Sequence, residues 1–208
     1  MVALLRARDI SEVSRALALD LIEEHVVRQS AMLHGLWDAS RLAVGALALQ
    51  CRPLSLGELV SACTDALKPA ATAAEVSLRS RVDAQVVVSG DERWLMHVVM
   101  NLLSNALKFT APRGAIDVDV GVTGQRANLR IADTGRGIAK ATLERIFDGP
   151  WDIHEANRAP HEKAGLGLFL VRKLVTLHGG EIHAQSDGIG HGSTFRLCLP
   201  LSSVDVGL

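Results

Sequence analysis

The stretch Asn101-Leu-Leu-Ser-Asn-Ala-Leu-Lys-Phe-Thr110 decides the fold of this chain of 208 residues. It ends a segment, Glu92–Phe109, whose apolar residues recur at the spacing of a buried helix face. Asn101 and Asn105 are four positions apart and therefore share one face, although asparagine is a poor residue for a helix interior. Carboxamide oxygens offered to a hard cation, with Lys108 one turn further on beside a phosphate, would explain the pattern. A solvated helix face is the plainer alternative.

Three glycine-containing segments follow along the chain. They are Asp133-Thr-Gly-Arg-Gly-Ile138 after a predicted strand, Gly165-Leu-Gly-Leu168 at the start of a predicted helix, and Gly190-His-Gly-Ser-Thr-Phe195 in a predicted hairpin turn. Glycine lets a backbone approach a ligand closely, and the free N–H groups of a helix start can hold a phosphate. An aspartate at a strand end can accept a hydrogen bond from an exocyclic amine. Each segment by itself is equally typical of an ordinary turn, so the interpretation depends on the order in which the segments occur.

In this order the segments resemble the N box and the three glycine boxes of sensor histidine kinases, and Ile146-Phe147 resembles their F box. The run Gly165–Glu181 is more similar to histidine kinases than to gyrase, mismatch-repair or heat-shock-chaperone relatives. The resemblance covers about residues 53–200. It implies an α+β fold, a two-layer α/β sandwich of the Bergerat (GHKL) type, which binds ATP.

The resemblance also implies ATP and Mg²⁺ as cofactors and gives roles to single residues. Asn105 would ligate Mg²⁺, and Lys108 would neutralise phosphate charge. Asn101 stands where ATP-hydrolysing relatives carry a glutamate base, which fits phosphoryl transfer rather than hydrolysis. Asp133 would bind the adenine amino group. The other residues that the resemblance places at the nucleotide are Phe109, Gly135, Gly137, Ile138, Phe147, Gly165, Leu166, Gly167, Leu168 and Thr194.

The sequence departs from the family pattern in the predicted lid, residues 148–163. Lys163 stands where the second glycine box usually begins with glycine, and it either stiffens the lid or adds a phosphate contact. Asp148-Gly-Pro-Trp151 replaces the common Glu-Pro-Phe. Trp151 either packs the lid onto the core or contacts a partner helix.

The first part of the chain reads as one long helix from about residue 9 to about residue 49. We expect residues 1–50 to be part of a dimerisation and phosphotransfer hairpin, and residues 51–208 to be the catalytic domain. No histidine of this helix is followed by the acidic residue and proline of a phosphoacceptor: Val follows His25 and Gly follows His34, and His25 is a poor candidate. The chain is then part of a longer kinase that cannot autophosphorylate alone. Its expected partners are a histidine-bearing helix in the parent chain or in trans, a response regulator receiver domain, and a second copy.

Composition narrows the class of protein further. The net charge is −1, the pI is near 6.7 and 3% of residues are aromatic, a balance that excludes a nucleic-acid surface. The three scattered cysteines indicate a reducing, cytoplasmic compartment, with a membrane anchor in the parent left open. Two alternatives stay open beside the histidine kinase: an anti-sigma-type serine kinase, and a nucleotide-binding regulatory module without turnover.

Spacing and turn residues predict the order of the elements. Pro53 ends the first helix pattern, and Asp91 caps the helix that carries the asparagines. The predicted elements are helices over 56–74, 92–109 and 165–177, a short helix ending near 147, and strands over 76–82, 86–88, 115–122, 127–132, 181–186 and 193–199.

Overall fold

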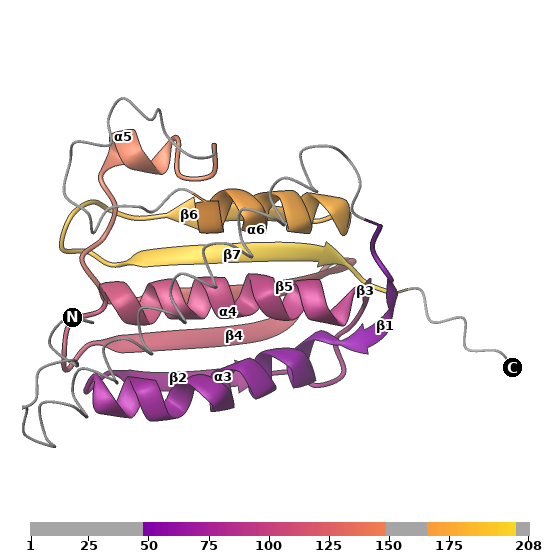
Figure 1. The fold of residues 1–208 in the computed structure, drawn as a ribbon, viewed down its shortest axis with the longest axis horizontal. Coiled ribbons are helices and arrows are strands. Elements are labelled where there is room, and N and C mark those ends of the chain that lie inside the picture. Colours follow the sequence, from indigo (N-terminus) through magenta and orange to yellow (C-terminus); the bar gives the residue numbers. More distant parts are fainter. Residues whose placement is uncertain (1–47, 149–165, 203–208) are drawn as a thin grey trace, which may run out of the picture. The chain divides into compact units, whose positions relative to one another are not determined.

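The structure is a computed structural model that describes residues 48–148 and 166–202 (Figure 1). Its elements are β1 (Arg52–Ser55), α3 (Leu56–Ala73), β2 (Ser77–Val82), β3 (Val87–Gly90), α4 (Glu92–Phe109), β4 (Ala115–Thr123), β5 (Arg126–Asp133), α5 (Lys140–Leu143), α6 (Leu166–Leu177), β6 (Glu181–Gln185) and β7 (Ser193–Pro200). The predicted long helix lies outside the described residues, except for its last two positions, 48 and 49, which are not helical.

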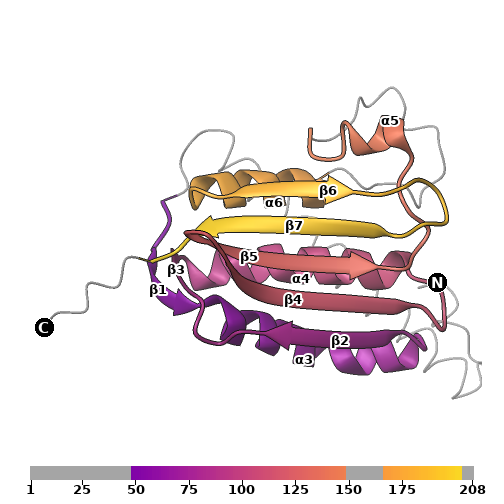
Figure 2. The same ribbon diagram turned by 180° about the vertical axis from the view of Figure 1, so that it is seen from behind.

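A five-stranded sheet forms one layer, in the order β2-β4-β5-β7-β6. Only β2 and β4 are parallel, and the other pairs are antiparallel. Helices α3, α4 and α6 lie across one face of this sheet (Figure 1), and Figure 2 shows the opposite face. The predicted two-layer α/β sandwich is confirmed.

The core lies between the sheet and the helices because the strands alternate. In β4, Ile116 and Val118 are buried against the helices, whereas Asp117 and Asp119 point to the other face. Each large apolar side chain buried in this way stabilises the fold by roughly 1.5–3 kcal/mol. Cys63 of α3 belongs to the same core, and burial raises the pKa of its thiol to about 11, so the thiol stays neutral.

Helix α4 is held at its start by two neighbours. Asp91 caps it by accepting the Trp94 N–H, at 3.4 Å, and donates its own N–H to Nε2 of His178, at 3.1 Å. The Nδ1 atom of the buried His178 lies 2.7 Å from the carbonyl oxygen of Leu174. This arrangement requires the proton on Nδ1, so His178 joins the end of α6 to the start of α4 as a neutral side chain.

Strand β1 is absent from the sequence prediction, which treats Pro53 as a break. The structure pairs β1 with β3 in an antiparallel register that sets Pro53 opposite Ser89. Proline is tolerated there because β1 is an edge strand. The main-chain N–H of Gln50 donates to Asp91 at 2.9 Å, which ties the chain entering the domain to the start of α4.

Helix α5 is shorter than the predicted helix, which reached Phe147. It covers four residues, and turns follow it. No residue of α5 is buried and no side chain caps its start. A short helix without tertiary packing gains little stability, so the pattern ends after one turn.

Candidate functional site

The two asparagines of α4 are hydrogen-bonded to each other. Nδ2 of Asn105 donates to Oδ1 of Asn101 at 3.1 Å, and both side chains are half-buried. The bond fixes the Asn105 carboxamide with its nitrogen toward Asn101. Among the residues that the structure describes, no donor reaches Oδ1 of Asn105, so this oxygen is available to a cation.

The start of α6 packs directly on this pair. A Cβ atom at Gly167 would lie 2.7 Å from Nδ2 of Asn101, so only glycine leaves the amide in place. Leu168 is buried beneath it. Of Leu166 only the backbone is described, and Gly165 lies outside the described residues. The structure therefore brings Asn101, Asn105 and Gly167 together from two helices.

Gly167→Ala is expected to weaken the affinity for Mg²⁺-nucleotide about tenfold while leaving the melting temperature almost unchanged. The new methyl group displaces Asn101, a side chain that can move without disturbing the backbone, and Asn105 then loses its hydrogen bond, worth about 1 kcal/mol or more. Calorimetry and thermal unfolding measure the two effects. Gly121→Ala is the matched control, since a Cβ atom there meets nothing within 4 Å. Equal affinities in the two variants would contradict the role of this contact.

A second group forms around Asp133, at the end of β5. Its Oδ1 accepts the Gly135 N–H at 2.8 Å, and its Oδ2 accepts the hydroxyl of Ser193 at 2.5 Å. Ser193 lies directly opposite in the register between β5 and β7. Each carboxylate oxygen keeps a further lone pair for an exocyclic amine. Ser193 was not predicted from the sequence, because only its register position opposite Asp133 marks it.

Thr194 does not join this group. It pairs with Ala132 on one side and with Gln185 on the other. Because side chains alternate along a strand, Thr194 lies on the opposite face of the sheet from Asp133 and Ser193.

The backbone of the first glycine segment lies against the end of α4. A Cβ atom at Gly135 would lie 2.4 Å from the carbonyl oxygen of Phe109. The same oxygen accepts the Arg136 N–H at 3.0 Å. Gly135 is therefore required for a close backbone approach rather than for an unusual dihedral angle.

The third glycine segment closes over the first. Gly137 has a φ of +70°, and a Cβ atom there would lie 2.0 Å from the carbonyl oxygen of Gly188. Gly190 donates its N–H to the Arg136 carbonyl at 2.7 Å. The N–H of Ile138 donates to the hydroxyl of Ser186 at 2.9 Å. Hydrogen bonds thus join two segments that are 48 residues apart at Ile138 and Ser186.

Two cations lie over the ring of Phe109. Nζ of Lys108 is 5.1 Å from the ring centroid, and Cζ of Arg136 is 4.1 Å from it. Both cations are exposed at the end of α4, where phosphate charge would need neutralising. Arg136 is a second cation that the sequence analysis did not select. Phe147 lies apart from this pair, with its ring edge-on to Phe195 of β7 at 6.4 Å.

Most of the predicted lid, including Trp151 and Lys163, lies outside the described residues. Its first residue, Asp148, pairs with Arg172 of α6 at 3.3 Å. Within residues 48–148 and 166–202, no three His, Cys, Asp or Glu side chains gather closely enough to hold a metal ion. An amide ligand assisted by phosphate oxygens is the cation chemistry that these residues fit. None of the described helices is long and apolar enough to cross a membrane.

Comparison with known proteins adds the family. Residues 90–203 match the family described as histidine kinase-, DNA gyrase B-, and HSP90-like ATPase. The chain is 35% identical over 183 residues to the circadian input-output histidine kinase CikA of Synechococcus elongatus, across 85% of this chain and 23% of CikA. It is 31% identical over 189 residues to the sensor histidine kinase RppB of Synechocystis, across 90% of this chain and 41% of RppB. The chain therefore spans less than half the length of these relatives.

Solved structures show the same fold. The histidine kinase AdeS of Acinetobacter baumannii matches with a TM-score of 0.68 at 21% identity, across 93% of this chain and 87% of AdeS. Full-length ShkA, solved in complex with AMPPNP, matches with a TM-score of 0.75 at 22% identity, across 96% of this chain and 41% of ShkA.

Sequence and fold agree on one family. The relatives named above are histidine kinases, which favours that interpretation over an anti-sigma-type serine kinase or a regulatory module. The boxes around Asn105, Asp133 and Gly167 lie within the matched residues. Gly167 contacts Asn101 of α4, and Gly135 of the Asp133 box lies against Phe109 at the end of the same helix. The chain belongs to the histidine kinase-, DNA gyrase B-, and HSP90-like ATPases, and it contains the ATP-binding catalytic domain of a sensor histidine kinase.

Proposed function

We propose that this domain binds ATP with Mg²⁺ and transfers the γ-phosphoryl group to a histidine on a separate helix, for relay to a response regulator receiver domain. Asn105 would hold Mg²⁺ through its amide oxygen. Asp133 would bind the adenine amino group, and Lys108 would lie beside the phosphates. Bound Mg²⁺ would neutralise charge that develops on the transferred group.

The hydrogen bond between Asn101 and Asn105 carries the proposal. Both side chains are amides, so neither can take a proton from water. ATP hydrolysis would need a base at this place, whereas transfer to a histidine needs positioning and charge neutralisation. The pair therefore favours a transferase, and the nucleophile and its base belong to the accepting helix.

The remaining residues of the proposed site are divided between the adenine side and the phosphate side of the nucleotide. Gly135, Gly137, Ile138 and Phe109 would enclose the adenine side, and Gly165, Leu166, Gly167 and Leu168 would lie on the phosphate side. Phe147 would hold the start of the lid against the sheet. We further propose that the protein works as a homodimer through residues 1–50, in the cytoplasm.

Phosphotransfer tests the proposal directly. The chain is incubated with γ-labelled ATP, Mg²⁺ and a separately prepared helical hairpin that carries a phosphoacceptor histidine. Label that appears on the hairpin, stable in base and labile in acid, is the expected result. Binding of ATP followed only by release of inorganic phosphate would overturn the transferase assignment.

Asn105→Ala is expected to lower the affinity for Mg²⁺-ATP by 10- to 100-fold and to leave the affinity for adenosine unchanged. The variant removes a ligand of a charged centre, worth about 1.5–3 kcal/mol, far from the adenine side. Calorimetry with and without Mg²⁺ measures the difference. Ser104→Ala, an exposed neighbour on α4, is the control. Undiminished dependence on Mg²⁺ in Asn105→Ala would remove Asn105 from the metal site.

A further inference from the structure

The face of the sheet opposite the helices carries a row of charged side chains. In the part of the chain that the structure describes, no helix covers this face (Figure 2). The strand register sets five residues side by side across all five strands. We name them the arginine row: Arg81 of β2, Asp119 of β4, Arg130 of β5, Arg196 of β7 and His183 of β6.

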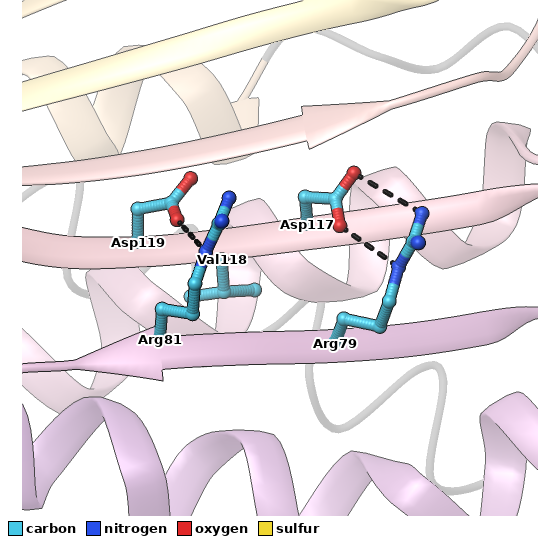
Figure 3. A pocket seen from close by; sticks show the side chains of 5 residues that line it. All are labelled: Arg79, Arg81, Asp117, Val118 and Asp119. Carbon is cyan, nitrogen blue, oxygen red and sulfur yellow. Dashed lines mark hydrogen bonds and ion pairs between the residues drawn. The ribbon is translucent and has the colours of Figure 1, made fainter.

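The first half of the arginine row is internally paired. Asp119 accepts from Nε of Arg81 through one oxygen and from Nη1 of Arg130 through the other, both at 2.9 Å. Figure 3 shows Arg81 and Asp119 next to a second arginine–aspartate pair, Arg79 and Asp117. These residues line a cavity of about 210 Å³. Both oxygens of Asp119 are thus engaged by other arginines, and none of the described contacts joins Asp119 to Arg196.

The whole face has more arginines than carboxylates, although the chain has a net charge of −1. Glu181 pairs with Arg126 at 2.8 Å, and this hydrogen bond and charge lower the pKa of Glu181. Every carboxylate of the face therefore has an arginine partner, while Arg196 has no carboxylate partner among the described residues. The outward arginines are Arg79, Arg81, Arg126, Arg130 and Arg196, and the carboxylates are Asp117, Asp119 and Glu181.

Arg196 lies directly opposite another arginine. Its register neighbours are Arg130 on one side and His183 on the other, and two arginines directly opposite each other destabilise a sheet. An anion seated over Arg196 would remove this repulsion. The positive charge that no carboxylate of this face offsets, among the described residues, is thus centred on Arg196 of β7.

The chemistry of the face favours carboxylates over nucleic acid. Three carboxylates divide the positive charge, and they would repel a phosphate backbone, which is charged at every step, more than a protein segment whose carboxylates are spaced apart. No Phe or Trp points outward from the five strands to stack on a base. The guanidinium fork matches a carboxylate in a bidentate geometry.

We propose that the arginine row is a docking surface for an acidic protein segment, one of whose carboxylates binds Arg196 between Arg130 and His183.

The test titrates the ¹⁵N-labelled full chain with an acetylated peptide of alternating glutamate and glycine at physiological salt. Shifts confined to β5, β7 and β6 are expected, with affinity reduced about tenfold in Arg196→Ala and lost in Arg196→Glu. Lys68→Glu places the same charge change on α3, away from the face, and should bind the peptide normally. Equal losses in Arg196→Glu and Lys68→Glu, or tighter binding to duplex DNA than to the peptide, would overturn the proposal.

Unfolding gives an independent readout. Arg196→Thr is expected to raise the melting temperature at low salt, and less so at high salt, because it removes the repulsion. Lys68→Thr should lower it or leave it unchanged, since Lys68 is paired with Asp65 at 2.6 Å. A lower melting temperature in Arg196→Thr would show that Arg196 serves the stability of the sheet, and would contradict the docking assignment.

Discussion

Gly137→Ala is expected to dismantle the nucleotide site, whereas Gly190→Ala, in the segment that closes over it, leaves the site in place. Both glycines have a positive φ, +70° and +86°. Alanine in this region costs about 1–2 kcal/mol at either position. The two positions differ in the space around them, and this difference makes them a matched pair.

At Gly137 the new Cβ atom would lie 2.0 Å from the carbonyl oxygen of Gly188 and 3.0 Å from its carbon. A backbone group cannot rotate aside as a side chain can, so the whole segment must move. That movement breaks the hydrogen bond from Gly190 to Arg136 and adds overpacking of about 1–3 kcal/mol. A Cβ atom at Gly190 meets nothing within 4 Å.

We therefore expect Gly137→Ala to lose at least tenfold in ATP affinity and about twice as much unfolding free energy as Gly190→Ala. Calorimetry and urea unfolding measure these quantities. Gly124→Ala, with a φ of +61° and open space in the distant β4–β5 hairpin, gives the cost of the dihedral angle alone. Similar losses in all three variants would mean that contact between the two glycine segments does not hold the site.

Asp133→Asn is expected to lower ATP affinity by 10- to 100-fold while the fold remains intact. Asparagine can still accept the Gly135 N–H, and its amide can donate to the hydroxyl of Ser193, so both local partners stay satisfied. The negative charge and one acceptor are lost. A hydrogen bond to a charged group is worth about 1.5–3 kcal/mol, more than a neutral one.

A second ligand distinguishes a role of Asp133 in binding the adenine amine from a role in supporting the turn. Purine riboside triphosphate lacks the exocyclic amine, so Asp133→Asn should bind it as the unchanged protein does. Ser193→Ala should weaken ATP only a few-fold and leave the affinity for purine riboside triphosphate unchanged, because it loosens the carboxylate without removing it. If Asp133→Asn loses affinity for both ligands equally, Asp133 supports the turn and does not bind the adenine amine.

The local elements were predictable because their signals are local. The Asp91 cap and the apolar spacing of Glu92–Phe109 give the bounds of α4 directly, and these bounds are confirmed. Strand β1 could not be predicted, since four residues with a proline become a strand only through pairing with β3, more than 30 residues further along the chain. The predicted length of α5 was wrong for a related reason. No residue of α5 is buried, so tertiary packing does not extend the helix.

The contacts of the site also fall into those that the sequence predicts and those that it does not. Asn101 and Asn105 share a face through helical geometry, and the structure joins them by a hydrogen bond. Ser193 and Asp133 are 60 residues apart, and only the β5–β7 register makes them neighbours. Arg136 lies over Phe109 because a turn folds back onto a helix end. Contacts of this kind depend on topology, which single-sequence patterns do not contain.

The small sheet at the start of α4 brings the two connections of the domain to one end. Val88 of β3 has Leu54 on one side and Leu201 on the other, so the strand that enters and the one that leaves flank the same residue. Helix α4, 18 residues and therefore about 27 Å long, runs from that junction to Asn105 and Phe109. The proposed nucleotide site thus lies about one helix length away from the two adjacent points where the chain enters and leaves the domain.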